Sequence, residues 1–495
     1  MTEVSDQEQQ RRWFWWRIAV RYGSGAIILV FFLTVVSHFR YTPDDTYVYL
    51  QYGRNIAEGE GFAFNKGAPG EGVPGPLWAL LIAGGSKLDL DPYIVAKTLD
   101  VVFACFAVLT CLAFAFMVIR DQVYALIAAW ICSFDAWVLR WSGTGIEASA
   151  GLLLTMLALW YAYRKEYVPA SLLAGLLSLV RFEWGLLILV ILADVVLNGK
   201  NRRTTIKVFV ASTIVYTVVV GSWMVFSYAL MGHAFPVTRH LGGGEGVLTS
   251  IVDVLKILGA TQAITGMALV AGIVVTVKRI GWNPLREDAV PMLWILILPL
   301  ILLLSGSGIG SRTLLPVVPI VSVYAVWGLR KLEIVSFQSI QRGLLVLVLV
   351  AIGALIQNQF VYQRWIVPHM TNVEMGINDC LKPIAYWLKA NTPPTTTVMS
   401  PEVGVIGYVS GRSVYDAEEA IDRSVRQAFS GITYDEAMLN RNYEHALDPV
   451  YVVDRAPAPE RLASPGVRPL LTRTFSGRGI RNPEMVYYTL YEVKR

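Results

Sequence analysis

Long apolar segments separated by short polar turns dominate the chain between residues 26 and 360. They cover approximately residues 26–36, 97–119, 122–139, 145–163, 168–180, 183–198, 205–230, 252–276, 290–306, 312–329 and 342–360. A helix needs about 18–20 apolar residues to cross a bilayer. The pattern therefore predicts about eleven membrane-spanning helices, and the two short segments at 168–180 and 183–198 suggest tilted or broken spans.

Basic residues recur in every second turn between these segments, which predicts the orientation. They are Arg11, Arg12, Arg17, Arg21, Arg120, Arg164, Lys165, Lys200, Arg202, Arg203, Lys278, Arg279, Arg286, Arg330, Lys331 and Arg342. Loops rich in Lys and Arg face the cytoplasm. We therefore expect a cytoplasmic N-terminus and, with an odd number of spans, an external C-terminus.

Three regions follow from this topology. Residues 1–25 form a cytoplasmic segment, and the apolar run after it has no small-residue cleavage site, which indicates an uncleaved signal anchor. Residues 26–370 form the transmembrane domain, with a first external loop at 40–97. Residues 371–495 form a small external α/β domain. Its pattern predicts one helix and four strands, at Cys380–Ala390, Thr396–Met399, Val403–Val409, Val450–Val453 and Met485–Val493. The predicted fold class is mainly α, a polytopic helical membrane bundle with this α/β domain.

Composition agrees with a membrane protein. Hydrophobic residues make up 55% of the chain and charged residues 16%, against roughly 25% charged in soluble domains. This excludes a soluble enzyme, a disulfide-framework domain and a disordered protein. Cys380 is the only cysteine of the C-terminal region, so that region has no internal disulfide, and the chain has neither a CxxC nor an HExxH motif. The net charge of +5 is explained by the topology and gives no support for a nucleic-acid partner.

Two adjacent carboxylates, Asp44 and Asp45, follow the first span by a few residues. A partly desolvated carboxylate at the membrane surface suits a general base that removes a hydroxyl proton. The alternative is structural, because Pro43 and the two aspartates open a helical stretch through Ala57 and acidic residues favour a helix N-terminus. The two aspartates can also differ in role.

Further ionisable residues lie at the predicted external helix ends, namely Glu147, Arg181, Glu183, His233, Arg239, His240 and Arg312. Each has a structural reading: Arg181 can pair with Glu183, Glu147 can serve capping or packing, and Arg312 can snorkel to the interface. The two histidines are too far apart to be called metal ligands. As a group, they favour chemistry at the outer interface over transport through the bilayer midplane.

Several motifs, taken in order, resemble those of the GT-C glycosyltransferases, in the branch of the mycobacterial terminal arabinofuranosyltransferases. The first loop has Asp44-Asp45-x-Tyr47 and then the run from Arg54 to Asn65 (RNIAEGEGFAFN). Later segments resemble the "sGlE", "RPEG", "lPNT" and "RyllPllP" motifs and a pattern early in the external domain. These are residues 142–147, 181–184, 235–238, 312–319 and 401–408. The pattern that starts with 401–408 ends in Asp416. Phe182 and Trp184 depart from the usual Pro and Gly, and Val237 replaces the usual Asn.

The resemblance implies a transferase that moves a sugar from a polyprenyl-phosphate donor to an external hydroxyl of a cell-envelope glycan, lipid or protein. Arabinofuranose is the candidate sugar that the resemblance suggests. Asp44 or Asp45 would be the general base. The donor phosphate would be held by Arg54, Arg181, Arg239 and Arg312, because the planar guanidinium binds two phosphate oxygens. Tyr47, Glu147, Glu183 and His240 are the candidate substrate-binding residues. The enzyme would lie in a bacterial plasma membrane, with its site facing the periplasm or cell exterior.

Other functions stay open at this stage. A transporter of a polar solute or lipid is the alternative, although the chain shows no internal repeat. A non-catalytic scaffold would leave the paired aspartates without a chemical role, and an oligosaccharyltransferase is disfavoured by the small external domain. No metal ligand set is assigned, although paired aspartates can bind a divalent ion. The sugar and the acceptor are not determined by the sequence.

Overall fold

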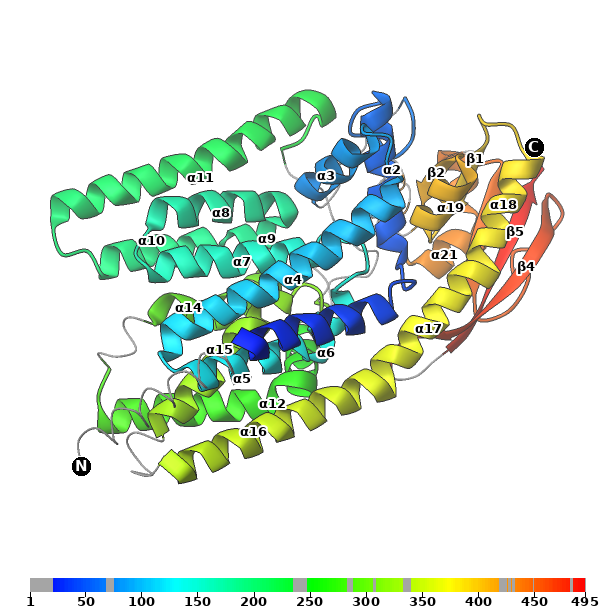
Figure 1. Cartoon of the computed structure of the whole chain (residues 1–495). Coiled ribbons are helices and arrows are strands. Elements are labelled where there is room, and N and C mark those ends of the chain that lie inside the picture. Colours follow the sequence, from blue (N-terminus) through cyan, green and yellow to red (C-terminus); the bar gives the residue numbers. More distant parts are fainter. Residues whose placement is uncertain are drawn as a thin grey trace, which may run out of the picture.

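The computed structural model describes residues 21–67, 75–234, 247–282, 288–305, 309–332, 340–417, 432–447, 449–480 and 484–494, together with Val425 and Phe429. The chain is a helical bundle with one small sheet near its C-terminus (Figure 1). This confirms the predicted fold class of a mainly α membrane bundle with a small α/β C-terminal domain.

Among the described residues, five helices are long and apolar enough to cross a membrane. They are α4 (Pro92–Ile119), α11 (Arg202–Met231), α12 (Val247–Arg279), α15 (Val318–Leu332) with the short turn Leu315–Val317 before it, and the helix that begins with α16 (Ile340–Val361). Shorter apolar helices complete the bundle: Arg21–Ser37, α3 (Pro76–Ser86), α5 (Gln122–Ser133), α7 (Ala148–Tyr163), α8 (Tyr167–Val180) and α14 (Ala289–Ser305). The helices agree with the predicted segments, while the number of crossings stays a prediction.

Two predicted spans are interrupted. The segment at 122–139 breaks after α5, and α6 (Ala136–Trp141) begins a new helix because the Asp135 carboxylate accepts the N–H groups of Trp137 and Val138. The segment at 183–198 is divided into α9 (Phe182–Gly185) and α10 (Leu187–Leu197). Hydrophobic length alone does not reveal such breaks, because the residues on both sides are equally apolar.

Helix α2 (Asp44–Glu58) confirms the helical stretch predicted in the first external loop. It lies between the bundle and the C-terminal domain (Figure 1), and it packs against both α3 and α19 (Val403–Ser410). Most of its middle turns are buried. The helix thus presents its side chains to two different parts of the molecule.

The bundle and the C-terminal domain are joined by an uninterrupted helical path. It runs from α16 through a π-helical turn (Tyr362–Ile366), α17 (Val367–Gly376), a second π-helical turn (Ile377–Leu381) and α18 (Lys382–Asn391) (Figure 1). The predicted domain boundary at 370/371 lies within this helix. Because helical hydrogen bonds continue across the boundary, no loop separates the two regions at this point.

The C-terminal domain contains a five-stranded sheet in the order β2-β1-β3-β5-β4. Strands β1 (Thr397–Ser400), β2 (Ser413–Asp416) and β3 (Tyr451–Ala456) are parallel, and β5 (Glu484–Val493) is antiparallel to both β3 and β4 (Val467–Arg478). The helix at Cys380–Ala390 and three of the four predicted strands are present.

The strand predicted at Val403–Val409 is wrong, because this segment is helix α19. Its β-branched residues favour a strand locally, but its first N–H groups are capped by a carboxylate of α2 and its residues pack against α2. Tertiary contacts therefore override the local preference. Strands β2 and β4 were not predicted.

Candidate active site

Four separate turns bring five of the predicted site residues into contact; we call Asp45, Glu147, Arg181, Glu183 and Arg312 the charged cluster. The Arg312 guanidinium donates from Nη1 to Asp45 Oδ2 at 2.6 Å, and its Nε lies 3.8 Å from Glu147 Oε1. The Asp45 side chain is 58% exposed, whereas Glu147 is fully buried. The cluster therefore extends from a solvent-facing carboxylate to a buried one.

Arg181 completes the cluster on its buried side. Its Nη1 donates to Glu147 Oε1 at 3.1 Å and its Nη2 donates to Glu183 Oε1 at 3.0 Å. The pairing of Arg181 with Glu183, expected as the structural alternative, is therefore present. The same guanidinium also contacts Glu147, so the pair is part of a larger network. Two arginines and three carboxylates meet here, and only Asp45 is mainly exposed.

The turn that carries Glu147 is held by three neighbouring elements. Thr46 of α2 donates its hydroxyl to Thr144 O, and the Trp78 indole of α3 donates to Gly145 O. Asp100 of α4 accepts the Gly145 N–H at 2.8 Å. Gly145 has a φ of +88°, and a Cβ there would lie 2.9 Å from the Thr46 side chain. Glycine fits here because the left-handed backbone and the close packing both exclude a side chain.

Two tryptophan indoles position the two arginines. Trp184 donates from Nε1 to Thr313 O, directly after Arg312, and Trp141 donates from Nε1 to Ser311 Oγ. Trp184 is fully buried, and a Cβ on Gly151 of α7 would collide with its ring. Trp184 stands where the resembling motif has glycine. The substitution adds a direct tie between the Arg181 turn and the Arg312 turn, and sequence reasoning had assigned it no role.

Asp44 faces away from this cluster. Its two carboxylate oxygens accept the N–H groups of Gly404 at 2.9 Å and Val405 at 2.7 Å, at the N-terminus of α19. Burial raises the pKa of Asp44 well above its ordinary value and nearby Glu402 adds to the rise, while the two N–H groups oppose it. The expected cap on α2 is therefore wrong, because α2 has no side-chain cap hydrogen bond among the described residues. Asp44 caps a helix of the C-terminal domain instead, some 360 residues away.

Arg54 also lies on the side of α2 that faces the C-terminal domain. Its Nη1 donates to Tyr408 O at 3.3 Å, its Cζ lies 4.7 Å from the Tyr408 ring centroid, and it bonds the Gln51 side chain. Asn65 exchanges two hydrogen bonds with the Val414 backbone of β2. We call this contact surface, with the bonds of Asp44, Arg54 and Asn65, the α2 seam. The structure does not bring Arg54 into the charged cluster.

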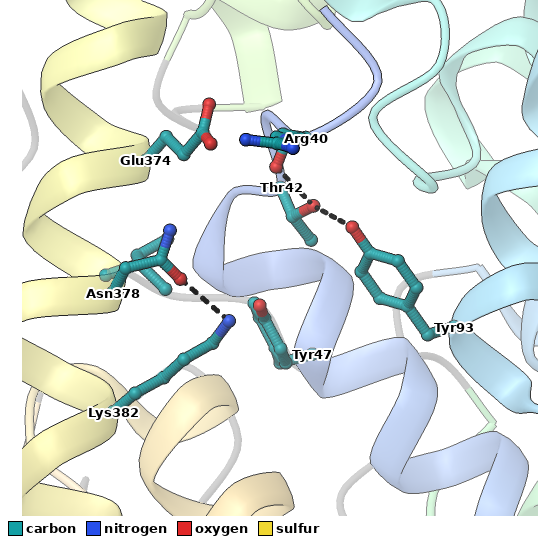
Figure 2. A pocket seen from close by; sticks show the side chains of 8 residues that line it. Arg40, Thr42, Tyr47, Tyr93, Glu374, Asn378 and Lys382 are labelled. Atoms are coloured by element: carbon teal, nitrogen blue, oxygen red, sulfur yellow. Dashed lines mark hydrogen bonds between the residues drawn. The ribbon is translucent and has the colours of Figure 1, made fainter.

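Tyr47 lines a separate cavity of about 300 Å³ between α2, the start of α4 and the long helix. Figure 2 shows its ring between Tyr93 on one side and Lys382 on the other, with Glu374 and Arg40 at one end. Lys382 donates to Asn378 at 2.8 Å, and Thr42 bonds the Tyr93 hydroxyl at 3.2 Å. The cavity is lined by two tyrosine rings, by the cations of Arg40 and Lys382 and by the carboxylate of Glu374. Such a lining can bind a small polar ligand through both stacking and hydrogen bonds.

The remaining predicted residues, Arg239 and His240, lie outside the described part of the chain, as does the motif at 235–238. Within the described residues, no group of three or more His, Cys, Asp or Glu side chains could hold a metal ion. Tyr49, Trp141 and Trp184, which sequence reasoning did not select, all border the charged cluster. Aromatic residues are common in membrane proteins, so their abundance in the sequence did not indicate which of them lie beside the charged cluster.

The charged cluster has groups suited to two chemical tasks. An exposed carboxylate can accept a proton from an incoming hydroxyl, and guanidinium groups can hold an anionic oxygen. Glu147 and Glu183 hold the two arginines in fixed positions, which reduces the reorganisation needed when a charged substrate binds. Both tasks need the ligand to enter from the exposed side, where Asp45 lies.

Comparison with known proteins gives a likeness in fold. No protein-family model matches the chain, and no curated protein matches its sequence. Among solved structures, ArnT from Cupriavidus metallidurans in the apo state superimposes with a TM-score of 0.54 at 11% identity, covering 93% of this chain and 97% of ArnT. ArnT bound to undecaprenyl phosphate gives a TM-score of 0.52 at 12% identity, covering 95% and 97%. At these identities the likeness establishes the fold alone: along nearly its whole length, the chain has the fold of ArnT.

Proposed function

We propose that this protein is an integral membrane glycosyltransferase of the GT-C superfamily that takes its sugar from a polyprenyl-phosphate donor. The observation that carries the proposal is the exposed Asp45 carboxylate, which contacts Arg312 in a cluster with buried Glu147 and Arg181. Two further facts support it: the fold is that of ArnT, a GT-C glycosyltransferase, and ArnT has been solved with undecaprenyl phosphate bound.

In this proposal Asp45 is the general base. Its side chain is mainly exposed and contacts Arg312, whereas Asp44 is largely buried and both of its oxygens accept backbone N–H groups. The acceptor hydroxyl attacks the anomeric carbon, its proton passes to Asp45, and the bond to the phosphate oxygen breaks. The polyprenyl phosphate leaves as an anion. Carboxylates beside the sugar stabilise the positive charge that develops on it.

Arg312 and Arg181 are placed to contact the phosphate, and Glu147 and Glu183 hold them. Tyr47 belongs to a different part of the site. The cavity that it lines has the size and polarity of a pocket for part of a saccharide, and we assign it to the acceptor. The donor sugar, with arabinofuranose as one candidate, and the acceptor are to be identified by assay.

The orientation belongs to the same proposal. The basic turns between the apolar segments support a cytoplasmic N-terminus in a bacterial inner membrane. The charged cluster and the C-terminal domain then lie on the periplasmic or outer side.

The test is sugar transfer by the purified protein from a panel of radiolabelled polyprenyl-phosphate sugars that includes decaprenyl-phosphate arabinose. An extract of envelope glycans and lipids serves as the acceptor source, and release of polyprenyl phosphate is measured in parallel. We expect transfer or donor hydrolysis with at least one donor, and its loss in Asp45→Asn. If the folded protein transfers sugar from none of the donors but moves a solute across the membrane of vesicles, the proposal is wrong and the protein is a transporter.

A further inference from the structure

Arg140, at the end of α6, is a buried cation without a counterion among the described residues. The residue is only 6% exposed, and its Nε and Nη1 atoms have no hydrogen-bond partner in the part of the chain that the structure describes. No described carboxylate forms an ion pair with it. By contrast, Arg181 and Arg312, at the same end of the bundle, each contact two carboxylates.

A buried charge without a partner is costly, because the group has lost its water and gained nothing equivalent. The rings of Trp141 and Trp137 offset part of this cost, since the Arg140 Cζ lies 4.7 Å and 5.9 Å from their centroids. A cation–π contact does not replace the hydrogen bonds of the guanidinium N–H groups. An unsatisfied buried arginine therefore needs an explanation, and an anion that binds only during function supplies one.

Arg140 adjoins the charged cluster through a shared indole. The Trp141 ring that contacts Arg140 also lies 5.8 Å from the Cζ of Arg312, and the Trp141 Nε1 holds Ser311, the residue before Arg312. The two guanidinium groups thus contact the same side chain. One of them is already paired with Asp45 and the other is unpaired.

The charge balance of the cluster points to the same need. Asp45, Glu147 and Glu183 provide three negative charges against two positive charges from Arg181 and Arg312. A phosphate that entered this set would meet a net negative charge among the described residues. Arg140 supplies a further positive charge next to Arg312, with donor groups that no protein atom uses.

We propose that Arg140 binds the phosphate of the polyprenyl-phosphate donor, an inference that rests on the proposed function. The Arg140 N–H groups donate to phosphate oxygens, and Trp141 keeps the guanidinium in place. The bound phosphate supplies the missing counterion, so the lipid both satisfies a buried charge and aligns its leaving oxygen beside Arg312. Arg140 is then a phosphate-binding residue whose charge is uncompensated until the donor arrives.

The experiment measures binding and thermal unfolding, with no sugar transfer required. Wild type, Arg140→Gln and Arg140→Lys are reconstituted in phosphatidylcholine nanodiscs and titrated with decaprenyl phosphate, with decaprenol, and with phosphatidylglycerol. Arg164→Gln is the matched control, because Arg164 lies 4.7 Å from the Trp160 ring but is exposed and paired with Glu166. Inorganic phosphate is added as a competitor.

We expect Arg140→Gln to bind decaprenyl phosphate roughly 10- to 100-fold more weakly, the loss typical of a hydrogen bond to a charged group. Binding of decaprenol should not change, Arg140→Lys should bind with intermediate affinity, and Arg164→Gln should behave as wild type. Without ligand, Arg140→Gln should unfold at the same or a higher temperature than wild type. Decaprenyl phosphate should raise the unfolding temperature of wild type more than that of the variant, and inorganic phosphate should weaken its binding to wild type.

Four results would overturn the proposal. Unchanged affinity of Arg140→Gln for decaprenyl phosphate would show that Arg140 does not contact the phosphate. An equal loss of decaprenol binding would show that Arg140 has a structural role. A lower unfolding temperature of the variant without ligand would show the same. If Arg140→Gln weakened the binding of phosphatidylglycerol as much as that of decaprenyl phosphate, the site would bind a bilayer phospholipid. None of these results depends on sugar transfer, so failure of the proposed function would be seen separately, as absent transfer with intact binding.

Discussion

The two sides of α2 differ in chemistry, although each carries one of the adjacent residues Asp44 and Asp45 at the start of the helix. On one side, Asp45 is mainly exposed and contacts Arg312 of the charged cluster. On the other side, Asp44 is buried in the α2 seam and caps α19. Successive helix residues are about 100° apart, so neighbours in sequence reach different surfaces. One side of the helix carries an exposed carboxylate, and the other fixes the helix against the C-terminal domain.

The largest expected effect separates the two aspartates directly. Asp45→Asn should lower the rate of sugar transfer by about 10²- to 10⁴-fold, the usual contribution of a general base, with little change in unfolding temperature. Asp44→Asn should instead lower stability by about 1–2 kcal/mol, because an amide can accept only one of the two N–H bonds well. Transfer rates and thermal unfolding of both variants give the comparison. Equal losses of rate at unchanged stability would remove the distinction.

A second, smaller effect concerns the buried end of the charged cluster. Glu147→Gln should destabilise the protein by about 3 kcal/mol, because it leaves Arg181 and Arg312 with one carboxylate each beside a neutral amide. Chemical denaturation in detergent measures this change. The control is Glu183→Gln, which removes a more exposed partner from Arg181 alone and should cost about 1 kcal/mol. A larger loss of stability in Glu183→Gln than in Glu147→Gln would show that Glu183, and not Glu147, is the main partner of the arginines.

A third prediction addresses the close approach of backbones in the α2 seam. A Cβ on Gly404 would lie 2.2 Å from the Asp44 carbonyl oxygen, so Gly404→Ala must push α19 away from α2. We expect a loss of about 1–3 kcal/mol, as for other overpacked sites. Gly84→Ala in α3 is the matched control, because nothing lies within 4 Å of its Cβ position. Differential scanning calorimetry should show the first variant destabilised and the second unchanged or slightly stabilised.

The smallest effect is expected from an exposed ion pair at the far end of α2. Lys66 and Glu58 form a salt bridge with both side chains largely in solvent. Lys66→Ala should change stability by less than about 1 kcal/mol and leave sugar transfer intact, because water and salt screen such pairs. Unfolding at low and high salt measures it. A strong loss of transfer in this variant would mean that the active surface extends beyond the charged cluster.

The sequence predicted the elements better than their connections. Apolar length gave most helices of the bundle, and Pro43 followed by two aspartates gave the start of α2. The break at Asp135 was missed, because a capping carboxylate leaves the mean hydropathy of an apolar run almost unchanged. The shortness of the segment at 183–198, by contrast, had already suggested a tilted or broken span, and this segment is divided into α9 and α10. The segment at Val403–Val409 was taken for a strand because its β-branched residues are typical of strands, and only its contact with α2 explains the helix.

The site was predicted in part for the same reason. Charge near the expected outer surface selected Asp45, Glu147, Arg181, Glu183 and Arg312, and these five meet in the structure. The motifs of the family resemblance also selected Arg54 and Tyr47, which lie elsewhere. Arg140 was not selected, although it lies in the short turn between the predicted segments at 122–139 and 145–163. That it has no carboxylate partner among the described residues is known only from the tertiary structure.

By itself the sequence determined that this chain is a helical membrane protein, where its apolar segments lie and which charged residues stand near their ends. These are local properties, fixed by the cost of placing polar groups in hydrocarbon. Tertiary structure alone decided that Asp44 and Asp45 serve opposite surfaces, that Trp184 ties two turns together and that Arg140 has no carboxylate partner among the described residues. These facts depend on contacts between residues that are far apart in the chain, and hydropathy carries no record of such pairings.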